Sequence, residues 1–302
     1  MKKNALLARS IFAVLTFAIG LSGCWNDMAS GKKEETRDTL SQVAADTAVE
    51  KRKVSDETTY ILPSPQQIAE IFKKSGLAYF QGLTNSPELC NKYRTGNSVE
   101  KALNLGVYSA DLSYCILNKQ SQESKNYFKC CHDLAVDLGL ANAFDMNNIS
   151  RRLERNIQNG DSVSHILADL QMNCDNILEE NNKEYLSVVS FTGAWVESIH
   201  FGIMVHAREK NQSISAKLLE QLNIAENVIK ALSAQLSQDS GIANLISNMK
   251  DINVLLNSIP AIHDAKTKDE PDQDFSKLVI KDEDLKKLCD RIEAFRSTIV
   301  KI

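Results

Sequence analysis

The group of residues best suited to chemistry is Glu197-x-x-His200, which lies in an otherwise apolar stretch. Residues three apart on a helix share a face, so this carboxylate and this imidazole would point the same way. Asp111 is a second acid among apolar neighbours and could be their partner. Carboxylate oxygens and imidazole nitrogens bind metals such as iron, manganese and zinc. Asp111, Glu197 and His200 are therefore candidate metal ligands in a helical core.

A structural role for the same three residues is the favoured alternative. Carboxylate di-metal proteins place Glu-x-x-His on two core helices, and this sequence holds one such pair. A buried acid needs a partner because an unpaired buried charge is costly. The three side chains could therefore satisfy one another in the core, or one of them could turn to solvent. Metal analysis of the purified domain separates the two hypotheses, since a stoichiometric metal lost in Glu197→Ala would support a metal site.

No other pattern in the chain indicates catalysis. The sequence contains no HExxH, no GxSxG and no phosphate-binding glycine loop. We therefore expect no cofactor. The choice between an enzyme and a non-enzymatic domain stays open, with the non-enzymatic domain favoured.

The N-terminal residues have the layout of an export signal. Met1 to Asn4 carry two lysines and no acid, and a mainly apolar run follows from Ala5 to Leu21. The run ends in Leu21-Ser22-Gly23-Cys24, an apolar residue, two small residues and a cysteine. This order resembles the lipobox of bacterial lipoproteins. The resemblance implies that residues 1-23 are removed and that Cys24 is acylated and becomes the mature N-terminus.

The same resemblance predicts where the protein resides. A mature lipoprotein carries at least two acyl chains, which is enough for stable anchoring. Trp25 follows Cys24 where the enterobacterial retention signal has Asp. Its absence favours the outer membrane, and the periplasmic face of the envelope is the broader expectation. Glu197 and His200 argue against a membrane span in residues 184-210.

Charge and cysteine content limit the possible partners. The formal net charge is −4, and it becomes more negative once the basic signal is removed. An acidic chain has no electrostatic reason to bind nucleic acid. The expected partners are a lipid membrane, through acylated Cys24, and an unidentified protein or small ligand. Disulfides can form in an exported protein, but the sequence cannot pair the six remaining cysteines, which are Cys90, Cys115, Cys130, Cys131, Cys174 and Cys289.

The rest of the chain divides into a tether and a helical domain. Residues 24-58 are polar and charged, which favours a tether that is disordered in part. Residues 59-302 contain little Gly or Pro and show helical apolar spacing. They predict a single all-α domain, an irregular multi-helix bundle of about eight or nine helices. The expected helices span about 65–83, 98–117, 121–139, 146–158, 161–180, 184–210, 215–236, 241–259 and 282–300.

Two of these helices share a weak pattern. Gly106-Val107-Tyr108 and Gly193-Ala194-Trp195 each place Gly two residues before an aromatic residue. Two helices that approach closely at glycine would explain the pattern, and chance would explain it equally well.

Taken together, these features predict a membrane-anchored lipoprotein of the cell envelope with a non-enzymatic helical binding or interaction domain. The alternative is a metal-binding or catalytic helical bundle centred on Glu197 and His200.

Overall fold

The computed structural model describes residues 51–53, 59–61, 64–74, 76–209, 217–221, 224–267 and 280–301. Backbone contacts divide the chain into Met1–Ala48 and Val49–Ile302, and all described residues belong to the second unit. The export signal, Cys24 and most of the expected tether therefore lie outside the described residues. Within residues 24-58, the stretch Lys51–Lys53 forms strand β1, which pairs antiparallel with β2 (Thr59–Ile61).

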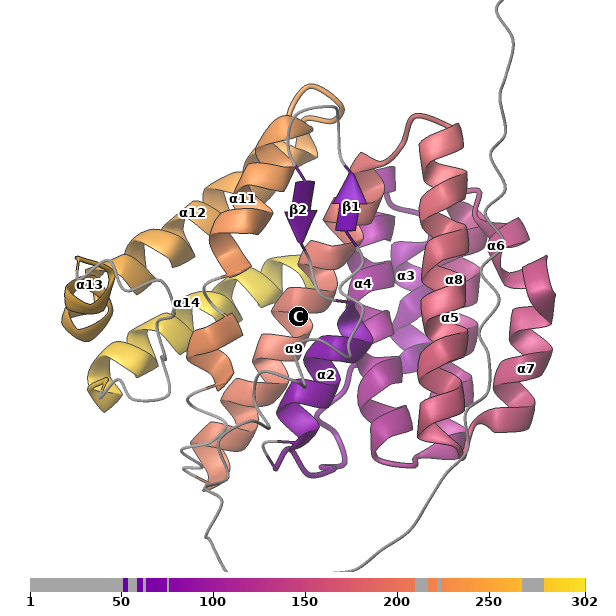
Figure 1. The fold of residues 1–302 in the computed structure, drawn as a ribbon, viewed down its shortest axis with the longest axis horizontal. Coiled ribbons are helices and arrows are strands. Elements are labelled where there is room, and N and C mark those ends of the chain that lie inside the picture. Colours follow the sequence, from indigo (N-terminus) through magenta and orange to yellow (C-terminus); the bar gives the residue numbers. More distant parts are fainter. Residues whose placement is uncertain are drawn as a thin grey trace, which may run out of the picture. The chain divides into compact units, whose positions relative to one another are not determined.

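Helices dominate the described residues, and the all-α fold predicted from the sequence is confirmed (Figure 1). The described part of the chain contains twelve α-helices, more than the eight or nine expected, because several are too short to carry a periodic pattern. They are α2 (Pro65–Lys74), α3 (Cys90–Tyr93), α4 (Ser98–Leu117), α5 (Ser121–Asp137), α6 (Ala141–Asp145), α7 (Ile149–Asn156), α8 (Gly160–Glu180), α9 (Tyr185–Glu209), α11 (Ile224–Ala234), α12 (Gly241–Ser258), α13 (Pro260–Thr267) and α14 (Asp282–Val300), with 3₁₀ turns η1 (Pro87–Leu89) and η2 (Met146–Asn148).

Local capping residues set several helix ends. Helix α2 starts with reciprocal hydrogen bonds between Ser64 and Gln67. Helix α4 starts with the equivalent pair Asn97 and Glu100. In both cases a side chain satisfies a backbone N–H that has no partner inside the helix. Gly139, with a φ of 85°, ends the turn after α5, as expected for a glycine C-cap.

Two helix boundaries differ from the sequence-based expectation, and one additional helix follows Pro260. Helix α2 ends at Lys74 and not near Leu83, because Gly76 has a φ of 100° and the N–H of Leu77 bonds back to Phe72. Helix α8 begins at Gly160, just before the expected start at 161, because the side chain of Asn159 accepts a hydrogen bond from the Ser162 N–H and caps the helix. Pro260 ends α12 but also occupies the first position of α13, where its missing N–H costs nothing.

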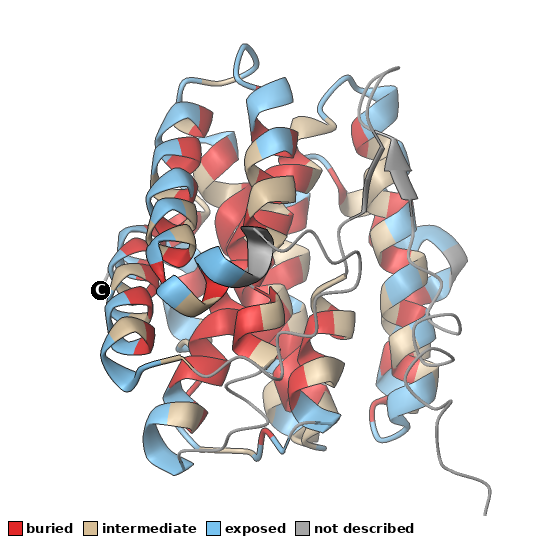
Figure 2. Cartoon of the chain, turned by 60° about the vertical axis from the view of Figure 1, so that its left-hand side comes forward, coloured by how far each residue is buried: buried red, intermediate tan, exposed pale blue. Residues whose placement is uncertain are grey.

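The centre of the fold is the pair α4 and α9. Both helices are buried on nearly all sides, whereas the outer helices keep one exposed face (Figure 2). Helix α9 is long and apolar enough to cross a membrane by length and composition, but 89% of its most apolar window is buried inside the fold. This degree of burial is typical of a core helix in a globular domain.

Glycines allow the two central helices to touch. A Cβ added at Gly106 would lie 1.8 Å from the backbone oxygen of Ser190 on α9. A Cβ added at Gly193 would lie 2.0 Å from the backbone oxygen of Leu103 on α4. The close approach that would explain the repeated glycine pattern is therefore present, and it brings the acids of α4 and α9 into one core.

Candidate functional site

Two of the three predicted site residues meet in the core. Asp111 on α4 and Glu197 on α9 are both fully buried. His200 is also buried, but its ring turns towards α14 and contacts neither acid in the hydrogen-bond network around them. The structure therefore pairs Asp111 with Glu197 and places His200 in a separate contact.

An arginine from the last helix neutralises Glu197. Arg296 of α14 donates from Nε to Glu197 Oε2 at 2.7 Å and from Nη2 to Oε1 at 2.8 Å. Two parallel bonds between a guanidinium and a carboxylate form the strongest geometry available to an ion pair. The Arg296 side chain is itself only 7% exposed, so water screens this pair very little.

An asparagine from an irregular segment connects the two acids to the arginine. Asn85 donates from Nδ2 to Asp111 Oδ2 at 2.9 Å and to Glu197 Oε1 at 3.0 Å. Its Oδ1 accepts from Arg296 Nη2 at 2.9 Å. All of its side-chain hydrogen-bonding groups therefore have partners within the network, as a buried amide requires. Asn85 itself is held by Tyr127, whose hydroxyl donates to the Asn85 carbonyl oxygen at 2.6 Å.

A second polar pair runs beside the first. His200 Nδ1 lies 2.8 Å from Glu293 Oε1, and Glu293 is one-third exposed. Glu197 and His200 are three apart on α9, and Glu293 and Arg296 are three apart on α14. The shared helix face predicted for Glu197-x-x-His200 is therefore used to pair α9 with α14.

This arrangement bears on the metal hypothesis. The guanidinium of Arg296 already supplies a positive charge to Glu197, at the position where a metal ion would have to bind. Within the described ranges, no three His, Cys, Asp or Glu side chains are grouped as metal ligands. Metal binding by Asp111 and Glu197 would require Arg296 to leave. In the structure, the hydrogen bonds and the ion pair of the network connect α4, α9 and α14.

The net charge of the network depends on whether Asp111 is protonated. Its pKa is raised well above the usual value, first because burial disfavours the carboxylate and second because the charge of Glu197 is close. The Asn85 hydrogen bonds and the positive charge of Arg296 oppose this rise without cancelling it. A protonated Asp111 next to the Glu197–Arg296 pair leaves the core with no net charge.

We expect Asp111→Asn to change how stability depends on pH. The native chain holds a proton on Asp111 that the unfolded chain releases near pH 4, so this group's contribution to stability falls as pH rises towards the raised native pKa. Asn mimics the protonated acid. Because Asn cannot ionise, the unfolding free energy of the variant relative to the wild type should increase as the pH rises above about 4, the ordinary pKa of an Asp carboxyl. Urea denaturation at several pH values measures this difference.

The neutral change Ser113→Ala on the same helix is the matched control, because it disturbs α4 without removing a titrating group. Its effect should not vary with pH. An Asp111→Asn difference that is equally flat would show that Asp111 does not titrate differently in the native state.

Sequence reasoning missed both Arg296 and Asn85. Arg296 had a detectable signal, because it takes a core position in the last helix, between Ile292 and Ile299 at spacings of four and three residues. A charged residue in an apolar stripe indicates a buried partner. Asn85 had no comparable signal, since it lies outside any periodic element.

The six cysteines in the described part of the chain divide into one disulfide and four thiols. Cys90 and Cys130 are joined, with 6.0 Å between their Cα atoms. Neighbouring Cys131 points elsewhere, with its Sγ 3.7 Å from the Ser109 hydroxyl. Burial raises the pKa of the Cys131 and Cys174 thiols to about 12 and that of Cys289 to about 11. These groups stay protonated near neutral pH and are therefore poor nucleophiles.

No protein-family profile, curated protein or solved structure matches this chain.

Proposed function

We propose that the chain is a lipoprotein of the bacterial cell envelope, anchored through acylated Cys24, whose helical domain binds a protein or a small ligand without catalysing a reaction. The membrane that holds it is proposed to be the outer membrane, with the domain on the periplasmic face or beyond it. The observation that carries the proposal is the sequence Leu21-Ser22-Gly23-Cys24 directly after a basic start and an apolar run.

The disulfide supports export. Structural disulfides persist in oxidising compartments such as the periplasm and are rare in the cytosol of most bacteria. Cys90 and Cys130 are 40 residues apart and face each other from α3 and α5. A chain whose fold brings two cysteines into bonding geometry is suited to the compartment that an export signal implies.

The polar core supports a binding role over a catalytic one. A general acid or base must come within hydrogen-bonding reach of its substrate. Asp111 and Glu197 have no exposed surface, and Asn85 and Arg296 occupy their oxygens. The two acids that were the best candidates for catalysis are thus hydrogen-bonded to other side chains of the core. We therefore propose that partners bind at the surface of the domain.

We expect Cys24→Ser to abolish lipid attachment. The thioether to diacylglycerol needs a thiol, and the peptidase that follows acts on the acylated cysteine in the family that this signal resembles. Cells grown with labelled palmitate should yield a labelled wild-type band, whereas the variant should be unlabelled, retain its signal peptide and migrate more slowly. Separation of inner and outer membranes then locates the labelled protein.

Cys289→Ser is the matched control, since it removes a thiol from the described domain and should leave the label unchanged. Label that persists in Cys24→Ser would refute the proposed anchor. A wild-type protein found entirely in the soluble fraction would refute it as well.

A further inference from the structure

The residues 84–94 form a bridging segment between α5 and α14. The segment contains η1 and α3 and lies between the irregular chain after α2 and the start of α4. Turn η1 buries none of its residues, and α3 is four residues long. Helices this short are not stable by themselves. The position of the bridging segment therefore depends on the bonds that it makes to its neighbours.

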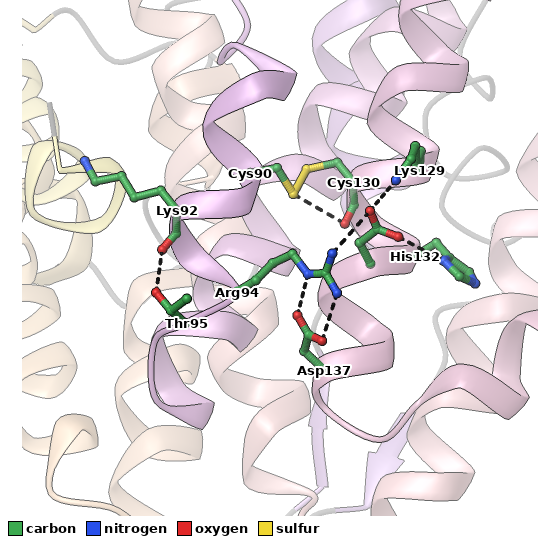
Figure 3. Close-up of polar contacts among 9 residues, drawn as sticks. Cys90, Lys92, Arg94, Thr95, Lys129, Cys130, His132 and Asp137 are labelled. Atoms are coloured by element: carbon green, nitrogen blue, oxygen red, sulfur yellow. Dashed lines mark hydrogen bonds and ion pairs between the residues drawn. A yellow bond between two sulfur atoms is a disulfide. The ribbon is translucent and has the colours of Figure 1, made fainter.

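On one side, the bridging segment is fixed to α5. The Cys90–Cys130 disulfide joins α3 to α5 covalently (Figure 3). Four residues later, Arg94 reaches α5 and bonds both carboxylate oxygens of Asp137, at 2.6 and 3.1 Å (Figure 3). Arg94 is about one-third exposed, so this ion pair adds little on its own. The disulfide is the dominant link.

On the other side, the same segment holds α14. Asn85 bonds Arg296 inside the buried network. The Tyr93 hydroxyl donates to the carbonyl oxygen of Val300, the last residue of α14. Lys92 Nζ donates to the next carbonyl oxygen, that of Lys301, at 3.2 Å. The bridging segment thus satisfies carbonyl groups at the end of α14 that no helical N–H can reach.

We propose that the Cys90–Cys130 disulfide is a redox-controlled lock on α14, acting through the bridging segment. With the disulfide formed, Asn85 and Tyr93 are fixed against α14 and Arg296 stays on Glu197. With the disulfide reduced, the bridging segment keeps the Tyr127–Asn85 and Arg94–Asp137 bonds to α5 but loses its covalent link. It then separates from α5 more often, and α14 opens more often with it. An opened α14 removes Arg296 from Glu197 and exposes the two buried acids.

The redox step is an ordinary thiol–disulfide exchange. In closing the lock, the two thiols lose two protons and two electrons to a disulfide oxidant, which becomes a dithiol. In opening it, a dithiol reductant gives up the same protons and electrons and becomes a disulfide. Cys90 and Cys130 are both 4% exposed, so the reductant reaches the disulfide only during brief local openings of the oxidised segment, and reduction then makes these openings more frequent. Cys131 faces Ser109 on α4 and so does not compete for the bond.

Hydrogen exchange of the full chain in detergent, followed by mass spectrometry, tests the lock. We expect a dithiol reductant to speed exchange at least about tenfold in peptides from 84–94 and 282–300, with α8 unchanged. The double variant Cys90→Ala/Cys130→Ala is the matched control. It should resemble the reduced wild type and should not respond to the reductant. Tyr93→Phe, which keeps the ring and removes the bond to Val300, should speed exchange at the end of α14 with the disulfide intact.

Two results would overturn the proposal. Faster exchange in 84–94 with α14 unchanged would show that the segment does not control the helix. An equal increase of the exchange rate in every helix, α8 included, would show that the disulfide stabilises the whole fold and does not control α14 specifically. The lock rests on the described fold and not on Cys24, so its failure would leave the proposed lipid anchor untouched.

Discussion

The variant Arg296→Met is expected to lose about 3–5 kcal/mol of unfolding free energy, because it leaves Glu197 as a buried charge without a countercharge. Arg296 is the cation that bonds Glu197, through two hydrogen bonds of 2.7 and 2.8 Å. It also bonds Asn85, so its loss frees an acceptor inside the core. Urea denaturation at neutral pH, followed by circular dichroism, measures the loss.

A double variant separates the ion pair from the packing around it. Arg296→Met/Glu197→Leu removes both charges and fills similar volume, so it should recover most of the stability lost in Arg296→Met alone. Arg296→Lys keeps the positive charge but cannot form the two parallel hydrogen bonds of the guanidinium. Its unfolding free energy should therefore lie between those of the wild type and Arg296→Met. A double variant less stable than Arg296→Met would mean that the network contributes by shape and not by charge compensation.

Local signals in the sequence predicted the helices well. The starts of α2 and α4, expected near residues 65 and 98, are confirmed, because a helix start depends on capping residues within one turn. The end of α2 was missed because Leu77 and Phe80 keep a helical spacing after Gly76 has ended the helix. Leu77 is buried all the same, from an irregular stretch. Apolar spacing indicates burial more directly than it indicates helix.

The candidate site was predictable only in part, because its partners are distant in sequence. Burial of Asp111 and Glu197 followed from their apolar neighbours. Glu197 and Arg296 are 99 residues apart, and Asn85 and Arg296 are 211 apart. The apolar pattern of one helix indicates which of its faces is buried, but not the helix against which that face packs. His200 had the right spacing to join Glu197, but the position of α14 gave it Glu293 as a partner.

The contact between the two central helices should be equally sensitive, and through a single methyl group. Gly106→Ala is expected to lose about 3 kcal/mol or more, since its Cβ would lie 1.8 Å from the Ser190 backbone oxygen. A backbone atom cannot rotate aside, so α4 and α9 must separate along their whole buried interface. The better helix propensity of Ala, about 1 kcal/mol, offsets only part of the loss. Thermal and urea denaturation both measure it.

Gly160→Ala is the matched control, because Gly160 opens α8 and a Cβ there would have no atom within 4 Å. It should leave the unfolding free energy within about 1 kcal/mol of the wild type, on the stabilising side. The double variant Gly106→Ala/Gly193→Ala tests whether the two glycines serve one interface. Each change separates the same two helices, so the second should cost less once the first is present. Additive losses would mean that each glycine relieves a local clash, and that α4 and α9 do not move as one interface.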